Sequence, residues 1–587
     1  MQIIPPRCAI AALLVAAIIT QAACQGANRA PPATAPAEAA ATATPDPNAI
    51  VWAVAAAPTT LDPARMAGDP AGALIAAQVY DRLVRFRPGT AQLAPGIAAR
   101  WEADMRAGTF TFSLRPGLKF HDGTPLDEQA VVWNFDRWMN PRHEAHLGKF
   151  VAWQGLFGGF LGQRDSQDKE AWLVESVEAI GPLQVRFKLR APFTPFLHHL
   201  AMIPFGLASP KAVADQGERY GNDRDHWPVG SGPFRVAGWG EDGAIRLRPF
   251  ADYWGGAPAS PGLEFVVIPD AEARSAAVAA GAAHGTDLAA TTPISGSLLA
   301  PGVIASPRPA RSTAWLIFNH GRPPLDNVKV RRAIALAIDR EGLARAYFGP
   351  LSIPAAQLLP PGFMGYNPAI QVPKPDPEAA KKLLAEEGAG ENFRLNIWVP
   401  AEPRPYLPDP VGTANAVAEM LKVIGINAAV RKQAPRQFLR DRDNGRFTAW
   451  IVGWEAQSAD PDNFWFWHFG IPGRIVAEGS YNNPDLATAL RDAQRVLDSE
   501  ERADVYRRAA GTVDRDAARV FLAHLRPIVL TSKRLRGYQP SPLGIDDFAG
   551  VTLAPGPAGA TPVPWATFAR PTAPSAPTSP TATAALQ

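Results

Sequence analysis

Hydrophobic residues along this chain occur in short runs, and many of these runs alternate with polar residues or are rich in β-branched and aromatic side chains. Runs of about four to eight residues with this pattern are typical of β-strands. The pattern predicts strands at residues 50–54, 110–114, 185–189, 263–268, 315–319, 394–399 and 449–453.

Helices are predicted between these strands. Val330, Ile334 and Ala337 recur at helical spacing, and Asp376 followed by Pro377 is typical of an N-cap and first helical position. Residues 281–287 are expected to form a long turn. The predicted helices cover residues 70–79, 209–213, 271–280, 330–338, 377–388 and 412–424. Because strands and helices alternate, the sequence predicts an α/β architecture.

The two ends of the chain differ from the rest. Arg7 precedes an apolar run at residues 8–19, which is too short to cross a hydrocarbon core of roughly 30 Å as a helix. We therefore expect residues 1–23 to be a secretory signal. Residues 24–48 and 554–587, which are rich in Ala, Pro and Thr, are expected to be a tether and a low-complexity tail.

Cys24 follows Ala22 and Ala23, and this arrangement resembles a lipobox. The resemblance implies that the thiol of Cys24 becomes lipidated after cleavage, and its two acyl chains would give a stable membrane anchor. Gln21 stands where lipoboxes usually carry Leu. Ordinary cleavage near Ala23 with an unmodified Cys24 therefore remains the alternative.

Composition excludes several classes of protein. The chain has 58 basic and 55 acidic residues, a formal charge of +3, and no cluster of Lys and Arg, so we expect no nucleic-acid partner. Cys8 and Cys24 are its two cysteines, so the exported protein is expected to form no disulfide and no cysteine-ligated zinc site. A length of 587 residues predicts more than one domain.

Motifs of catalysis are missing from the sequence. It contains neither GxSxG nor HExxH. Asp460 and Asp462 could form a carboxylate pair for acid and base chemistry, but turn capping explains them more simply. His198 and His199 lie in an apolar run that favours a buried pair over a ligand-binding pair. We expect neither an enzyme nor a bound cofactor.

Residues 76–126 contain a Tyr80-Asp81 turn, a strand at residues 110–114 and the sequence LKFHDGTP. In this order they resemble the signature region of the family 5 periplasmic solute-binding proteins, the dipeptide, oligopeptide and nickel receptors of ABC importers. Further segments resemble the family in the same order, over roughly residues 48–545: YWGG at 253–256, VKVRRAIALAIDRE at 328–341, RPYLP at 404–408 and YNNPDL at 481–486.

This resemblance implies the two-lobed type II periplasmic-binding fold, with an additional subdomain inserted in the first lobe. By position, lobe I would comprise residues 49–308 and 525–553, its subdomain about 96–215, and lobe II 309–524. The implied function is capture of a peptide-like or other small carboxylate-bearing solute by lobe closure, followed by delivery to membrane permease subunits. We expect a monomer in the periplasm or at the outer face of the cytoplasmic membrane.

Site residues are likewise implied by position in the family. An Arg in the segment matching RPYLP anchors a carboxylate in peptide receptors, which here is Arg404, with Tyr406 beside it. The alternative is that Arg404 caps a helix or pairs with Asp409. In lobe I, Pro58 and Thr59 follow the first strand and would approach the ligand.

A second segment, residues 453–462, would offer backbone hydrogen bonds from a strand edge, with Gly453, Trp454 and Glu455 near the ligand. The alternative for Trp454 is a core tryptophan. Gln457 stands where peptide receptors carry an Asp that pairs with the ligand's ammonium group. A neutral amide brings no charge to offset desolvation of an ammonium, so peptide is less firmly indicated than family membership.

Three other functions remain open. Nickel receptors in the family imply a metal or metal-chelate ligand as an alternative. A binding protein could also present its closed form to a membrane sensor instead of a permease. A secreted hydrolase is the third, and the missing nucleophile motif argues against it.

Overall fold

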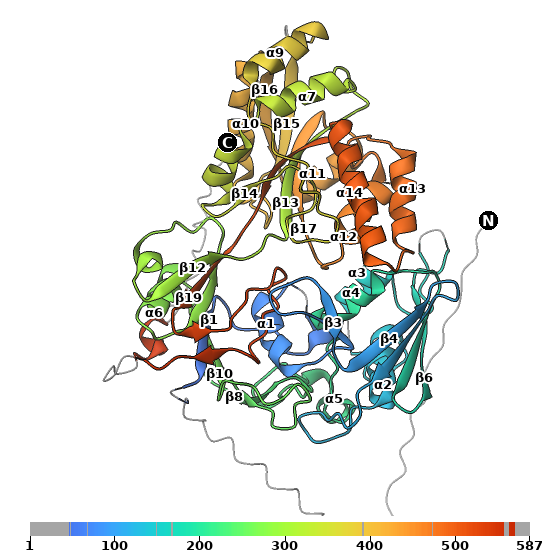
Figure 1. Cartoon of the computed structure of the whole chain (residues 1–587), viewed down its shortest axis with the longest axis vertical. Coiled ribbons are helices and arrows are strands. Elements are labelled where there is room, and N and C mark those ends of the chain that lie inside the picture. Colours follow the sequence, from blue (N-terminus) through green and yellow to red (C-terminus); the bar gives the residue numbers. More distant parts are fainter. Residues whose placement is uncertain are drawn as a thin grey trace, which may run out of the picture. The chain divides into compact units, whose positions relative to one another are not determined.

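The computed structural model describes residues 46, 48–66, 68–147, 150–165, 168–389, 393–471, 474–556 and 563–569. Cys24 and the predicted signal peptide lie outside the described residues. Three larger sheets organise the described part of the chain, with seven, four and six strands (Figure 1). We call the first two, with the helices that pack on them, lobe I and the inserted subdomain, and the third lobe II.

Lobe I is built on the seven-stranded mixed sheet. Side chains of its central strand alternate between two cores: Ile50 and Trp52 lie in one, with α1, and Ala53 lies in the other, with α6. Both faces of the sheet are therefore covered, as expected for an α/β lobe. The strand order is β12 (Val303–Pro307), β19 (Ile528–Ser532), β11 (Gly285–Leu288), β1 (Ile50–Val54), β10 (Leu263–Val267), β9 (Ile245–Pro249) and β8 (Phe234–Trp239).

The inserted subdomain is an antiparallel sheet with one helical face. Phe110 and Phe112 of its second strand share a core with Phe135 and Trp138 of α2, while the alternate residues Thr109, Thr111 and Ser113 are half-buried. Its strands are ordered β4 (Ala98–Asp104), β5 (Thr109–Leu114), β7 (Gln184–Leu189) and β6 (Val174–Gly181). A small two-stranded sheet, β2 (Val84–Phe86) with β3 (Leu93–Pro95), precedes it.

Lobe II repeats the two-faced arrangement. In its strand β13, Leu316 and Phe318 belong to the core covered by α7 and α10, whereas Trp315 and Ile317 belong to the core covered by α13 and α14. The strand order is β14 (Ile353–Pro354), β18 (Arg519–His524), β13 (Ser312–Phe318), β17 (Ala449–Glu455), β15 (Arg394–Pro400) and β16 (Asn427–Gln433).

Helices connect these strands. Those of lobe I and the subdomain are α1 (Pro70–Val79), α2 (Glu128–Met139), α3 (Val151–Phe157), α4 (Phe196–Leu200), α5 (Pro210–Gln216) and α6 (Ala271–Ala279). Those of lobe II are α7 (Val328–Ala337), α8 (Arg340–Leu343), α9 (Pro377–Glu386), α10 (Pro410–Val423), α11 (Pro435–Asp443), α12 (Asp462–Trp465), α13 (Pro484–Ala493) and α14 (Ser499–Arg515), with π-helical turns η5 (Ala344–Phe348) and η6 (Phe466–Gly470).

The chain crosses between the lobes twice, from β12 to β13 and from β18 back to β19. The crossings are tied together, because the backbone N–H of Arg308 donates to the carbonyl of Pro527 over 2.8 Å. Arg308 forms ion pairs with Asp287 and Asp546 of lobe I, at 2.6 and 2.8 Å, while Arg311 pairs with Glu455 of lobe II at 3.0 Å. Two arginines of one crossing thus bind opposite lobes.

One sequence prediction is wrong. Residues 281–287 are not a turn throughout, because Gly285–Leu288 form β11, between β1 and β19 in the sheet. The strand is short and begins with Gly-Thr-Asp, so its own sequence gives no strand signal. Its place comes from tertiary packing: a Cβ on Gly285 would lie 2.2 Å from the ring of Trp52, so only glycine fits there.

Three further features complete the described fold. The inserted subdomain contacts lobe II, where the N–H of Thr194 donates to the carbonyl of Gln494 over 2.7 Å.

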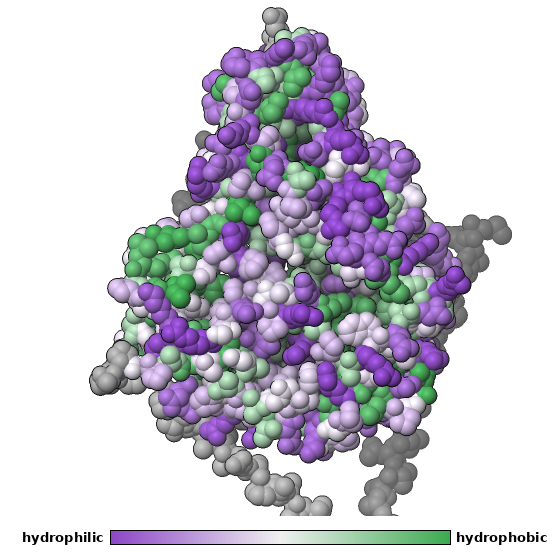
Figure 2. All heavy atoms as spheres, viewed as in Figure 1, coloured by the Kyte–Doolittle hydropathy of each residue, from purple (hydrophilic) through white to green (hydrophobic). Residues whose placement is uncertain are grey.

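Figure 2 shows an apolar patch near β12 and α6, where Leu299 and Ile304 are exposed. Within the described ranges, no helix combines the length and apolar character that crossing a bilayer requires.

Candidate ligand-binding site

A cavity of about 390 Å³ opens on lobe II beside the carboxyl end of β17. This volume falls within the range of about 300–1,000 Å³ that is usual for small-molecule sites. The residues that line it come from β13, β17, the end of β15 and the loop after it, helix α11, η6 and residues 474–478. Its lining residues include Arg404, Tyr406, Phe438, Leu439, Arg442, Trp450, Val452, Gly453, Trp454, Trp467, His468, Arg474 and Glu478.

Strand β17 forms the base of the cavity. It pairs with β13 along its whole length but with β15 only at Ala449 and Trp450. Beyond Trp450, this edge of β17 therefore has no neighbouring strand among the described residues. Such an edge can donate and accept backbone hydrogen bonds with an extended ligand.

Gly453 brings Tyr406 onto this strand. A Cβ at Gly453 would lie 2.3 Å from the carbonyl oxygen of Thr313 and 2.7 Å from the ring of Tyr406. The missing side chain thus lets the phenol ring lie directly against the backbone of β17. Burial raises the pKa of Tyr406, so the phenol is neutral at physiological pH.

Arg404 reaches the cavity from a tight loop. Its backbone exchanges two hydrogen bonds with Leu407, each 2.9 Å long, which fixes the turn between β15 and α10. The predicted alternative of a pair with Asp409 does not occur: Asp409 instead caps α10 by accepting from the N–H of Gly412 over 2.8 Å. Among the described residues, the Arg404 guanidinium has no ion-pair partner.

Trp454 is held in place by Asn463. The indole N–H of Trp454 donates to Oδ1 of Asn463 over 3.0 Å, and the same oxygen accepts from the backbone N–H of Gln457. On its other side, Trp454 stacks on Trp467, with ring centroids 5.8 Å apart. Trp467 is 41% exposed, so the stack reaches from the core of lobe II to solvent.

Glu478 is a buried carboxylate at the inner end of the cavity. It lies 2.8 Å from Arg519, 3.1 Å from Arg474 and 3.1 Å from His468. Burial alone would raise the pKa of Glu478, but the surrounding positive groups outweigh it and hold the pKa at about 2. Burial lowers the pKa of His468, so at neutral pH the two guanidiniums supply the balancing charge.

Four predicted site residues therefore meet at this cavity: Arg404, Tyr406, Gly453 and Trp454. Glu455 and Gln457 are not among its lining residues. The carboxylate of Glu455 binds Arg311 of the lobe crossing, and the side chain of Gln457 is exposed.

The lobe I residues are also not part of the lining. Pro58 is buried, and Thr59 is exposed, with its hydroxyl donating to Asp69 over 2.7 Å. Asp69 in turn caps α1. Among the described residues, no group of three or more His, Cys, Asp or Glu side chains is arranged to hold a metal ion.

Several lining residues had no prediction from the sequence. Trp450, Phe438, Arg442, Trp467 and Glu478 lie in three segments between residues 438 and 478: α11, β17, and the region of η6 and Glu478. One signal was available: the run FWFWHFG at residues 464–470 has too many aromatic residues for one face of a helix. In the structure this run forms the end of α12 and the π-helical turn η6, a feature that occurs frequently at functional sites.

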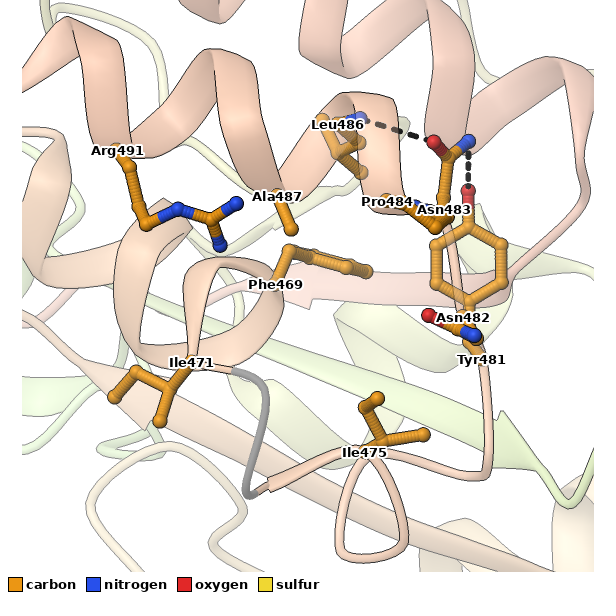
Figure 3. Close-up of a pocket in the computed structure, with 10 residues that line it drawn as sticks. All are labelled: Phe469, Ile471, Ile475, Tyr481, Asn482, Asn483, Pro484, Leu486, Ala487 and Arg491. Carbon is orange, nitrogen blue, oxygen red and sulfur yellow. Dashed lines mark hydrogen bonds between the residues drawn. The ribbon is translucent and has the colours of Figure 1, made fainter.

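A second, smaller cavity of about 160 Å³ lies behind η6 (Figure 3). Phe469 is one of its lining residues, and the side chain of Asn483 accepts from the N–H of Leu486 and donates to the hydroxyl of Tyr481. Its volume is below the usual range for a ligand site, and it contains no predicted site residue. The cavity beside β17, which four predicted site residues line, is therefore the candidate site.

Comparison with known proteins agrees with this fold. The sequence model of the bacterial extracellular solute-binding proteins, family 5, matches residues 92–473. The chain is 29% identical over 494 residues to the dipeptide-binding protein of Escherichia coli K12, which covers 81% of this chain and 89% of that protein. It is 30% identical over 551 residues to heme-binding protein A of Haemophilus influenzae, covering 92% and 98%.

A solved structure extends the agreement to three dimensions. HbpA2 from Haemophilus parasuis superposes with a TM-score of 0.78 and 29% identity, covering 86% of this chain and all of that one. The predicted two-lobed type II fold and the predicted family are both confirmed. The chain belongs to the bacterial extracellular solute-binding proteins of family 5.

Proposed function

We propose that this protein is the substrate-binding component of an ABC importer and that it captures a peptide-like or other small carboxylate-bearing solute. Capture takes place at the lobe II cavity, with closure of the lobes around the solute and delivery to membrane permease subunits. The names of two relatives, a dipeptide-binding protein and a di/tripeptide-binding protein, support the class of ligand.

The observation that supports this proposal most directly is that Arg404 lines the cavity without a carboxylate partner among the described residues. Its guanidinium lines the cavity beside the neutral phenol of Tyr406 and, within the described part of the chain, has no carboxylate partner. A guanidinium presents a planar fork that matches a carboxylate, and such charged hydrogen bonds are stronger than neutral ones. A ligand carboxylate would provide the missing partner.

A matched pair of ligands tests this role. Titration calorimetry with N-acetyl-Ala-Ala and its C-terminal amide should show tighter binding of the acid to the wild-type protein. Arg404→Gln should weaken binding of the acid on the order of 10- to 100-fold and remove its advantage over the amide. Native mass spectrometry of gently purified protein should also show a carried-over ligand that is lost in this variant.

Arg440→Gln is the matched control, because Arg440 is an exposed arginine of α11 that does not line the cavity. It should leave the affinity for the acid unchanged. Equal affinities for acid and amide in the wild-type protein would contradict the carboxylate anchor. A rise in melting temperature with nickel that a chelator reverses would favour the metal-receptor alternative.

We further propose that the protein is exported through residues 1–23 and anchored to the membrane through a lipidated Cys24. The family consists of extracellular proteins, which supports export. The small residues before Cys24 support the anchor.

A further inference from the structure

Positively charged side chains outnumber negatively charged ones among the residues that line the cavity. Three arginines, Arg404, Arg442 and Arg474, face one carboxylate, Glu478. Glu478 is already engaged by Arg474 and by the buried Arg519. Its negative charge is therefore neutralised inside lobe II, and the positive charge of Arg404 and Arg442 is left at the cavity.

Arg442 is the unexpected member of this group. It extends from α11, and its side chain is only 16% exposed. Its ion-pair partner is Asp443, the next residue in the chain, at 2.7 Å; that carboxylate is itself 53% exposed. Asp443 engages Nε and Nη2 of Arg442, and among the described residues the Nη1 amino group has no hydrogen-bond partner.

Arg404 and Arg442 act on the same phenol. Both guanidiniums are close enough to Tyr406 to oppose the rise in its pKa that burial causes. Two like charges that approach one neutral ring repel each other, and an anion placed near both would remove that repulsion. For an ammonium group, by contrast, the described lining of the cavity offers no free carboxylate, because Glu478 is already engaged, Glu455 pairs with Arg311 and Gln457 is exposed.

Building on the proposed function, we propose that the cavity selects solutes with two acidic groups, such as a peptide with an acidic side chain. Arg404 takes one carboxylate and Arg442 takes the second. Arg442 is therefore a residue that determines specificity, in addition to the anchor at Arg404.

Two pairs of blocked dipeptides separate this second contact from the first: N-acetyl-Ala-Glu with N-acetyl-Ala-Gln, and N-acetyl-Glu-Ala with N-acetyl-Gln-Ala. Members of a pair have nearly the same size and share the C-terminal carboxylate, and they differ by one charge. In at least one pair, the acidic member should bind the wild-type protein about tenfold tighter or more by calorimetry. Raising the salt concentration should reduce this ratio.

Substitutions then assign the preference to Arg442. Arg442→Gln should bring the ratio of affinities for the acidic and the neutral peptide of a pair close to one. Arg442→Lys should keep part of the preference for the acidic peptide, and Arg440→Gln should keep all of it. Asp443→Asn should increase the ratio, because it removes the carboxylate that competes for Arg442. Since Asp443 is exposed, this variant provides a test even if Arg442→Gln fails to fold.

The outcomes also distinguish the two proposals. If the glutamine peptides bind through Arg404 and the acidic ones bind no better, the second acidic contact is wrong while the carboxylate anchor stands. A preference that survives in Arg442→Gln and does not respond to Asp443→Asn would also overturn it. If no blocked dipeptide binds the wild-type protein, both proposals fail.

Discussion

Gly453 shows how one residue shapes the candidate site. The strand around it is apolar, and most other amino acids at this position would favour a β-strand more than glycine does. Glycine is required because the Tyr406 ring occupies the space that a side chain at residue 453 would need. The position of the phenol depends on the absence of a side chain at this residue.

Gly453→Ala should therefore destabilise the protein and weaken ligand binding. The new methyl group would lie 2.3 Å from the Thr313 carbonyl and 2.7 Å from Tyr406, so the strand or the ring must move. We expect a loss of about 1–3 kcal/mol in the free energy of unfolding, measured by denaturant titration.

Gly181→Ala is a suitable comparison, because Gly181 also lies in a strand, β6, and a Cβ there meets no atom within 4 Å. That change should leave stability nearly unaltered or slightly improved. Equal effects of the two substitutions would show that Tyr406 does not rest on Gly453 in solution.

Some residues that were predicted from family positions come together in the structure. Arg404, Tyr406, Gly453 and Trp454 meet at one cavity because each belongs to a segment with a recognisable order in the chain. Arg442 and Glu478 could not be predicted in this way, since their roles arise only when α11 and the segment after η6 fold against β17. The predicted contacts of all eight residues with a ligand, including those of Pro58, Thr59, Glu455 and Gln457, stay predictions.

Elements with clear start and stop residues could be located from the sequence. Helices α1 and α9 begin at Pro70 and Pro377, as predicted, the predicted cap Asp376 is present at α9, and β1 matches its predicted range. Helix α10 begins at Pro410, two positions before its predicted start, because Asp409 is its cap. Strand β11 was missed because it depends on its neighbours rather than on its own residues.

Helix α12 begins in a buried polar cluster. The carboxylate of Asp460, which precedes the helix, binds Arg502 through two contacts, the longer of them 2.7 Å, and lies 3.0 Å from His198 of the inserted subdomain. It also accepts from the N–H of Asp462, so the predicted turn capping is present. His198 and His199 are both buried, in agreement with their apolar surroundings in the sequence.

Asp462 makes stability depend on pH. Burial, together with the charge of Asp460, raises the pKa of Asp462 to about 7, whereas an unfolded Asp titrates near 3.9. Between about pH 4 and pH 7 the native state therefore binds more protons than the unfolded state, and this residue's contribution to stability falls as pH rises. Above pH 7 the full cost of the buried charge is present.

Asp462→Asn should consequently stabilise the protein more at pH 8 than at pH 5. The difference in melting temperature between variant and wild type, followed by calorimetry from pH 5 to pH 8, should grow with pH. Asp485→Asn, which changes an exposed carboxylate in the first turn of α13, should show no such trend. A constant difference across this range would contradict an ionised Asp462 at high pH.

At the scale of the whole molecule, alternation of strands and helices predicted the α/β class, and the order of family segments predicted two lobes. Neither pattern could predict the ion pairs that fix the two chain crossings between the lobes. Arg308 and Arg311 are three residues apart, yet their carboxylate partners lie at Asp287, Asp546 and Glu455. Contacts over such separations have no local signal in a sequence.

Export and anchoring concern the molecule as a whole. If Cys24 is lipidated, the full-length protein should partition with membranes and its mature N-terminus should carry the mass of a diacylglyceryl group. Cys24→Ala should release the protein into the soluble fraction, because it removes the thioether attachment.

Fractionation with mass spectrometry of the N-terminal peptide checks this prediction, and Cys8→Ala is its control, because Cys8 lies inside the predicted signal. An unmodified Cys24 in the mature wild-type protein would favour ordinary cleavage near Ala23.

The stacked pair of Trp454 and Trp467 has one more consequence. Trp467 is 41% exposed, and Arg474 lies over its ring with 4.6 Å between guanidinium carbon and ring centroid. A solute that enters the cavity would exclude water from this indole and change the electric field at the ring. The ultraviolet fluorescence of Trp467 should therefore change in wavelength and intensity. The receptor therefore carries its own fluorescent reporter of occupancy, and comparison with Trp467→Phe would isolate that signal from the other tryptophans.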